Sequence, residues 1–101
     1  MHLHLPEAVV EDGGYRRYDT GNMLLVVAHP KGSSESNVAL MALEGEGGWY
    51  WSASVVYVSE RNGGPVESRA EAERAAMSAL GELQQQHERE FGQKLNLPWE
   101  K

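Results

Sequence analysis

Two histidines, His2 and His4, alternate with leucines at the start of the chain, and this pattern predicts a short strand over 2–5. Alternation of period two would place both imidazoles on one strand face, where they could share a metal ion. A complete site would need a third ligand from His29, His87 or a carboxylate, and the sequence sets none of these at a ligand spacing. A terminal pair of this kind is more typical of a solvent-facing strand edge, so we predict no metal and no other cofactor.

Other residue types that carry out chemistry also lack a catalytic pattern. The three serines of the loop 31–37 are not part of a G-x-S-x-G elbow and have no base paired with them. The glycines at 45, 47 and 48 lead into a strand, whereas a phosphate-binding loop leads into a helix N-terminus. His87 falls at the edge of an apolar helix stripe, as a half-buried core histidine would. We therefore predict that the protein is not an enzyme, with a small metal-dependent enzyme as an alternative.

The charge balance disfavours nucleic acid as a partner. Acidic residues outnumber basic ones by 15 to 9, which gives a net charge of −6 and repels a phosphate backbone. The segment Tyr15-Arg16-Arg17-Tyr18 is the one cluster that combines basic and aromatic side chains. A nucleic-acid-binding protein would have to gather Arg16, Arg17, Lys31 and Arg61 on one face. The acidic surface instead favours a protein partner with a basic surface.

Apolar runs separated by turn residues predict an antiparallel meander. The aliphatic run at 23–29 ends at Pro30, and the run at 38–43 would also suit a short helix. The run at 49–59 is the longest, and its alternation places Trp49 and Trp51 on one face. The predicted strands cover 15–18, 23–29, 38–43 and 49–59, with turns at 19–22 and 44–48. The residues Asn62-Gly63-Gly64-Pro65 are expected to end the last strand, because they favour turns.

A single long helix is predicted over 69–91. Ser68 and Glu71 have the spacing of a capping box, and Gly92 is a typical residue for a helix C-terminus. The helix would be about 35 Å long, enough to cover the third strand from end to end. The apolar stripe is rich in alanine, so the Trp side chains of the facing strand would supply the missing volume. The stripe comprises Ala72, Ala75, Ala76, Ala79, Leu80 and Leu83.

The runs at 23–28 and 38–43 are apolar on both faces, which is typical of strands buried on two sides. One helix covers one side only, so the second side needs another cover. The candidates are internal segments, a second copy of the chain, or a partner protein. The internal segments would contribute Leu3, Leu5, Val9, Val10, Leu97 and Trp99. The residues predicted to bind a partner are Met41, Leu43, Tyr50, Val56, Val58, Glu44, Glu46 and Trp99.

Length and composition predict one cytoplasmic domain over 1–101. A chain of 101 residues without cysteine excludes disulfides and thiolate chemistry. The N-terminus lacks the basic and apolar regions of a signal peptide, and no apolar run approaches the ~20 residues of a membrane span. The tail 93–101 is expected either to dock on the body or to bind a partner.

These observations predict an α+β fold, a three- to five-stranded antiparallel meander with one long C-terminal helix packed on one face. In outline, a strand meander followed by an Ala-rich helix resembles double-stranded RNA-binding domains and the bodies of some antitoxins. That resemblance implies nucleic-acid binding, but the helix here is acidic and lacks a lysine cluster. The preferred function is therefore a small protein-binding inhibitor or adaptor, of the kind that phages and mobile elements direct against host nucleic-acid machinery (anti-CRISPR-like or anti-restriction-like). A small nucleic-acid-binding or antitoxin-like domain is the alternative.

Overall fold

The computed structural model describes residues 14–28, 37–95 and 97. The predicted strand over 2–5, with its two histidines, and Trp99 lie outside the described residues. The elements, in chain order, are β1 (Tyr15–Asp19), β2 (Met23–Ala28), β3 (Val38–Gly45), β4 (Gly48–Val55), β5 (Ser59–Val66) and α1 (Arg69–Phe91).

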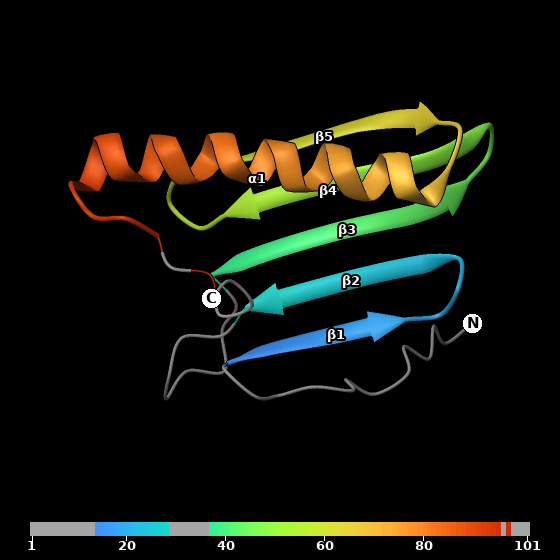
Figure 1. Ribbon diagram of the computed structural model, residues 1–101, viewed down its shortest axis with the longest axis horizontal. Coiled ribbons are helices and arrows are strands. Elements are labelled where there is room, and N and C mark those ends of the chain that lie inside the picture. The colour runs from blue at the N-terminus through green and yellow to red at the C-terminus, as the bar shows by residue number, and fades with distance from the viewer. Residues whose placement is uncertain (1–13, 29–36, 96, 98–101) are drawn as a thin grey trace.

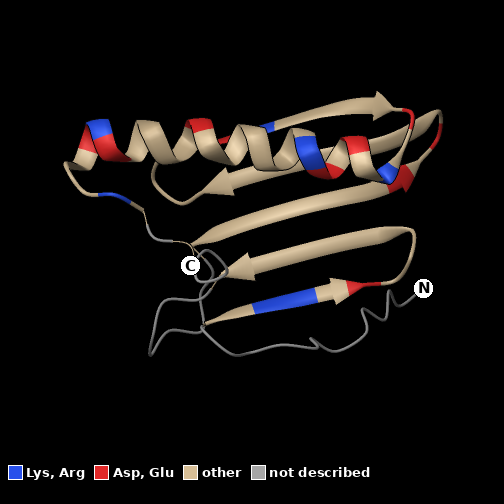
Figure 2. Ribbon diagram, in the orientation of Figure 1, with Lys and Arg blue, Asp and Glu red and all other residues tan. Residues whose placement is uncertain are grey.

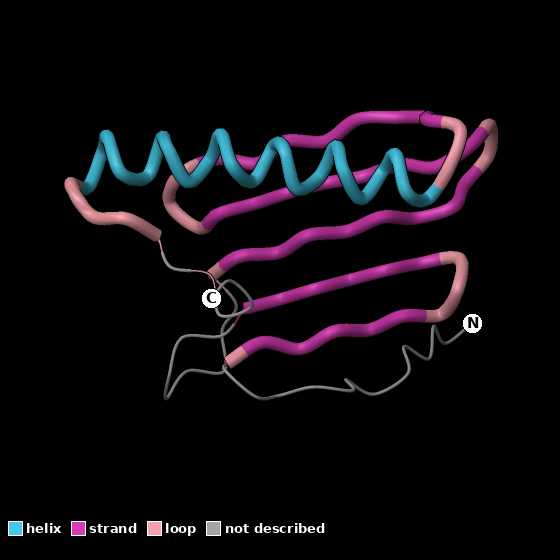
Figure 3. The backbone as a smooth tube through the Cα atoms, viewed as in Figure 1, coloured by secondary structure: helices cyan, strands magenta, loops and turns pink. Residues whose placement is uncertain are grey.

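The five strands form one antiparallel sheet in the order β1-β2-β3-β4-β5, and each strand pairs with its neighbour in sequence. Figure 3 shows this meander as a tube, with the helix running along one face. The predicted α+β architecture is therefore confirmed, with a five-stranded sheet. Within this part of the chain no helix is both long and apolar enough to cross a membrane.

The helix begins and ends at the predicted residues. The Ser68 hydroxyl accepts a hydrogen bond from the Glu71 backbone N–H at 3.2 Å, which satisfies a donor that the first turn leaves unpaired. Gly92 takes the left-handed conformation, φ 70°, and its N–H donates to the Glu88 carbonyl. Five members of the predicted stripe are buried: Ala72, Ala76, Ala79, Leu80 and Leu83.

The predicted third strand over 49–59 is wrong after Val55. Strand β4 ends at Val55, the chain turns through 56–58, and β5 returns alongside β4. The Val58 N–H donates to the Val55 carbonyl at 3.1 Å, and Tyr57 takes a positive φ of 64°. The sequence does not reveal this turn, because Val55 to Val58 are all residues that favour strands. Tyr57, expected to face the helix, is instead 91% exposed at the tip of the hairpin.

The residues predicted to break the strand lie inside β5. A Cβ atom at Gly63 would come within 2.7 Å of the Trp51 ring, so this ring occupies the space above the glycine. Gly64 has φ 116° and lies against the backbone of β4, next to an irregularity in the register between Trp49 and Trp51. These glycines therefore permit close approach between two strands, which is a second use of the residue besides turns.

The helix lies off the centre of the sheet. It packs against β3, β4 and β5, so it covers part of its face and leaves β1 and β2 beside it (Figure 1). The buried core lies beneath the helix and is made of small and aliphatic side chains. It comprises Ala28, Val38, Leu40, Ala53, Val55, Ala76, Ala79, Leu80, Leu83 and Leu97.

The segment after the helix returns to the body. Leu97 is 4% exposed and belongs to the core cluster, while Leu95 packs against that cluster. Two helix side chains contact backbone carbonyls of this segment: the Gln84 amide donates to Leu95 at 3.2 Å, and His87 Nδ1 lies 2.9 Å from the Gln93 oxygen. The described part of the tail is thus docked, and His87 contacts it in a structural role.

Candidate functional site

The sheet face opposite α1 carries an apolar patch built from alternate residues of three strands. In the register, Met23 pairs with Leu43 and Leu43 with Tyr50, so these three side chains form one row on the far face. Leu25 and Met41 pair in the adjacent row. We call these five residues the far-face patch. Its members are half-buried, except that Leu43 is exposed at 37%.

The far-face patch has an acidic residue beside it. Glu46 lies in the turn after β3, and its carbonyl accepts a hydrogen bond of 2.6 Å from the Tyr50 hydroxyl. Glu60 lies on the same sheet face but farther from the patch, on the edge strand β5 across from Ser54. Acidic positions mark the β3–β4 turn in Figure 2. An apolar centre with a carboxylate at its edge suits a protein surface with an apolar centre and a basic rim.

The predicted partner-binding residues do not all come together. Met41, Leu43 and Tyr50 lie in the patch, with Glu46 at its edge. Glu44 pairs with Trp49 and so belongs to the face that carries α1. Val56 and Val58, expected on the far face, lie instead in the β4–β5 turn. Five residues of extended strand separate that turn from Tyr50, about 17 Å. Trp99 is outside the described residues.

A groove on the helix side was not predicted. It lies between α1 and β2, has a volume of about 280 Å³, and exists because the helix is displaced toward β5. Its floor is apolar and Met77 on the helix wall is 43% exposed. The narrow apolar stripe of the helix was the signal in the sequence that could have predicted this groove, because a single helix with a narrow apolar face cannot cover five strands. The lining comprises Arg17, Leu24, Val26, Leu40, Met41, Ala42, Glu73, Ala76 and Met77.

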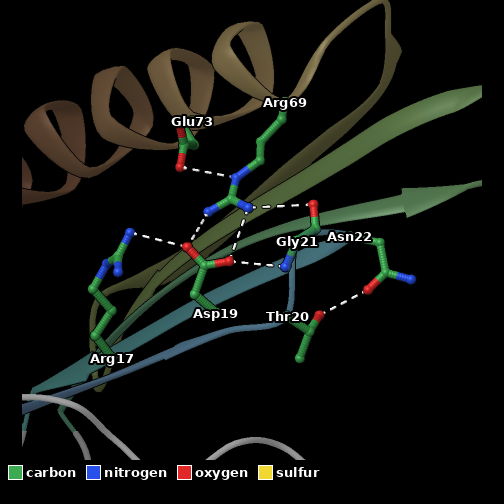
Figure 4. Close-up of polar contacts among 7 residues, drawn as sticks. All are labelled: Arg17, Asp19, Thr20, Gly21, Asn22, Arg69 and Glu73. Carbon is green, nitrogen blue, oxygen red and sulfur yellow. Dashed lines mark hydrogen bonds and ion pairs between the residues drawn. The ribbon is translucent and has the colours of Figure 1, made fainter.

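A cluster of ion pairs fixes the start of α1 to the end of β1 (Figure 4). The Arg69 guanidinium donates to both carboxylate oxygens of Asp19, at 2.9 and 2.6 Å, and to Glu73 at 3.3 Å. Arg17 donates to the same Asp19 carboxylate at 3.1 Å. Two parallel N–H···O bonds make the Arg69–Asp19 pair stronger and more directional than a single contact. This pair sets the position of the helix relative to β1 and therefore the end of the groove.

The electrostatics of Asp19 follow from these contacts. The hydrogen bonds from Arg69 and from the Gly21 N–H lower the pKa of Asp19 far below its ordinary value, and the same pairing raises the pKa of Arg69. Since the pKa of the carboxyl is lower in the folded protein than in the unfolded chain, its ionised form stabilises the fold. That contribution is complete above the ordinary pKa near 3.8 and declines as the pH falls below it.

We expect Asp19→Asn to destabilise the protein by about 1 kcal/mol at pH 7, because it removes a bidentate pair whose side chains are 23% and 27% exposed. The difference between variant and wild type should shrink when urea denaturation is repeated near pH 2.5. Glu82→Gln is the matched control, since its pair with Arg61 is more exposed, at 43% and 56%. A penalty for Asp19→Asn that stays constant with pH would contradict the role given to the charge.

The basic residues named for nucleic-acid binding do not form one surface. Arg17 and Arg61 lie on the helix side of the sheet and are paired with Asp19 and Glu82. Arg16 lies on the opposite face of β1, and Lys31 is outside the described residues.

Over the described ranges, no group of three or more His, Asp or Glu side chains could hold a metal ion. No family model, no curated protein and no solved structure matches this chain.

Proposed function

We propose that this protein is a non-enzymatic binding module that occupies the surface of a partner protein with its far-face patch. The observation that carries the proposal is the pair of apolar rows on the sheet face that α1 does not cover. A solvated antiparallel sheet normally alternates apolar and polar side chains, and larger apolar patches with polar rims mark interaction sites. Such a module acts as an inhibitor or adaptor, because it blocks or bridges a surface without reacting.

The partner that fits has an apolar centre and a lysine- or arginine-containing rim. The carboxylate of Glu46 would face that rim, and the net charge of −6 favours its approach at low salt. Proteins that handle nucleic acids present basic surfaces of this kind. We therefore place host nucleic-acid machinery first among the candidate targets.

The test compares two surface variants of the full chain as bait in extract of the source organism. Leu43→Glu introduces a charge into the patch, and Met77→Glu introduces one on the helix side at similar exposure. A protein retained by wild type and by Met77→Glu, but not by Leu43→Glu, is then purified for titration. We expect Leu43→Glu to weaken its binding at least about 30-fold, as for a hot-spot residue.

Two further readouts can contradict the proposal. Affinity should fall when the salt concentration is raised from 50 to 500 mM, because the rim contacts are between exposed charges. A salt-independent affinity contradicts the basic rim, and equal binding by both variants contradicts the patch. If light scattering shows that wild type forms a dimer that Leu43→Glu abolishes, the patch binds a second copy of the chain instead of a different protein.

A further inference from the structure

The hairpin between β4 and β5 presents a tyrosine in a conformation that tyrosine disfavours. Tyr57 has φ 64°, and no other described non-glycine residue has a positive φ. The left-handed region crowds the Cβ atom, so glycine or asparagine would fit this position better than a bulky side chain. Strained residues of this kind concentrate at functional sites. The position of the side chain is therefore informative.

The side chain of Tyr57 contributes little to the fold. It is 91% exposed, the highest value among the exposed large hydrophobic residues, and the neighbouring Val56 is 48% exposed. A smaller residue such as glycine or asparagine would form the same turn without backbone strain and without exposing an aromatic ring. Packing therefore gives no reason for a tyrosine at this tip.

The base of the hairpin is rigid, although its tip is exposed. Val55 is buried in the core cluster and Val58 packs against that cluster. The Val56 N–H donates to the Asn37 carbonyl at 3.0 Å, which ties the turn to the start of β3. A fixed base holds the backbone of Tyr57 in one place before binding, so less ordering is needed when a partner binds. Rigid tyrosines are common anchors in protein interfaces for this reason.

We infer that Tyr57 is an anchor that inserts into an apolar pocket of a partner protein, at a contact separate from the far-face patch. The pocket would need a hydrogen-bond acceptor for the phenol hydroxyl, since buried tyrosines usually donate. Its rim would carry a cation, because Glu60 is exposed beside the turn and forms no ion pair with any described residue. The net charge of −6 argues against an anionic bilayer as the occupant. This inference rests on the proposed function only in that the partner is a protein.

The first experiment separates the two surfaces by crosslinking in cells of the source organism. A photoreactive benzoylphenylalanine is placed at position 57, at position 43 in the far-face patch, or at the exposed Arg74 on the helix. We expect a discrete protein adduct from position 57 and none from position 74. An adduct from position 43 without one from position 57 overturns the inference and leaves the proposed function standing. An adduct from position 57 without one from position 43 supports the inference and contradicts the binding role of the far-face patch. Absence of any adduct from 57, or an adduct to lipid or to a second copy, overturns the inference.

The second experiment tests the trade-off between strain and binding with the identified partner in pure form. Tyr57→Gly should raise Tm by about 4 °C, because it relieves the backbone strain, and should weaken binding at least about 30-fold. Tyr57→Phe keeps the strain and the ring, so Tm should not change and binding should weaken between about 2- and 10-fold. A lower Tm for Tyr57→Gly, or unchanged binding, would show that the tyrosine serves the fold and not a partner.

Discussion

Replacing Gly64 by alanine should lower the free energy of unfolding by about 3 kcal/mol and Tm by about 15 °C. Two penalties add at this position. The backbone has φ 116°, a region that L side chains rarely adopt. The new Cβ atom would also lie 2.7 Å from the Trp49 carbonyl oxygen and 2.9 Å from the Tyr50 Cα atom. These neighbours are backbone atoms of β4 and cannot move without breaking the ladder.

Gly21→Ala is the matched control, because it imposes a positive φ without a steric clash. Gly21 has φ 87°, and an added Cβ atom would have no neighbour within 4 Å. We expect this variant to lose only the backbone contribution, about 1 kcal/mol. Urea denaturation of both variants separates the clash from the conformational penalty. Equal losses would show that β4 and β5 do not approach as closely as the structure indicates.

Leu97→Ala should destabilise the protein by about 3 kcal/mol, the range for a buried leucine whose removal leaves a cavity. Leu97 is 4% exposed and belongs to the same cluster as the buried helix residues, although it follows the helix stop at Gly92. Its contribution should appear in urea denaturation as a lower midpoint with an unchanged slope.

Lys94→Ala provides the comparison for the tail, since Lys94 is exposed in the same segment and should change stability by less than about 0.5 kcal/mol. If Leu97→Ala has no larger effect than this control, the segment after Gly92 is not part of the core. It would then be available as a binding motif, which was the other role considered for the tail.

Local signals in the sequence were sufficient to predict the bounds of the helix. Ser68 and Gly92 mark its ends because capping residues satisfy orphan backbone groups, and this chemistry depends only on near neighbours. The strands β2 and β3 were predicted for a similar reason, since each is a short apolar run bounded by turn residues.

The remaining errors share a tertiary cause. The turn after Val55 contains no glycine, proline or asparagine, so the predicted strand continued through it. Gly63 and Gly64 were interpreted as a break, whereas Trp51 and the β4 backbone need the space that a side chain would fill. The position of α1 across the sheet depends on packing between elements and on the Arg69–Asp19 pair, whose members are 50 residues apart. No local pattern reports such a contact.

Only part of the far-face patch was predicted, because the rest of it depends on contacts between distant strands. Alternation placed Met41 and Leu43 on one side of the sheet, and pairing with Tyr50 follows once the meander is assumed. Val56 and Val58 were assigned to that side only because the third strand was predicted to continue to residue 59. Met23 and Leu25 join the patch through the register of β2, which requires the paired strands to be known.

The irregular path of β5 has a consequence for self-association. This strand forms one edge of the described sheet, and open edges of regular sheets can add further strands from other molecules. Pro65 has no N–H to donate, the register beside it is irregular, and Glu60 and Arg61 place opposite charges along the same edge. Each of these features discourages edge-to-edge association into fibrils, so the molecule can display apolar surface on its faces while this edge resists aggregation.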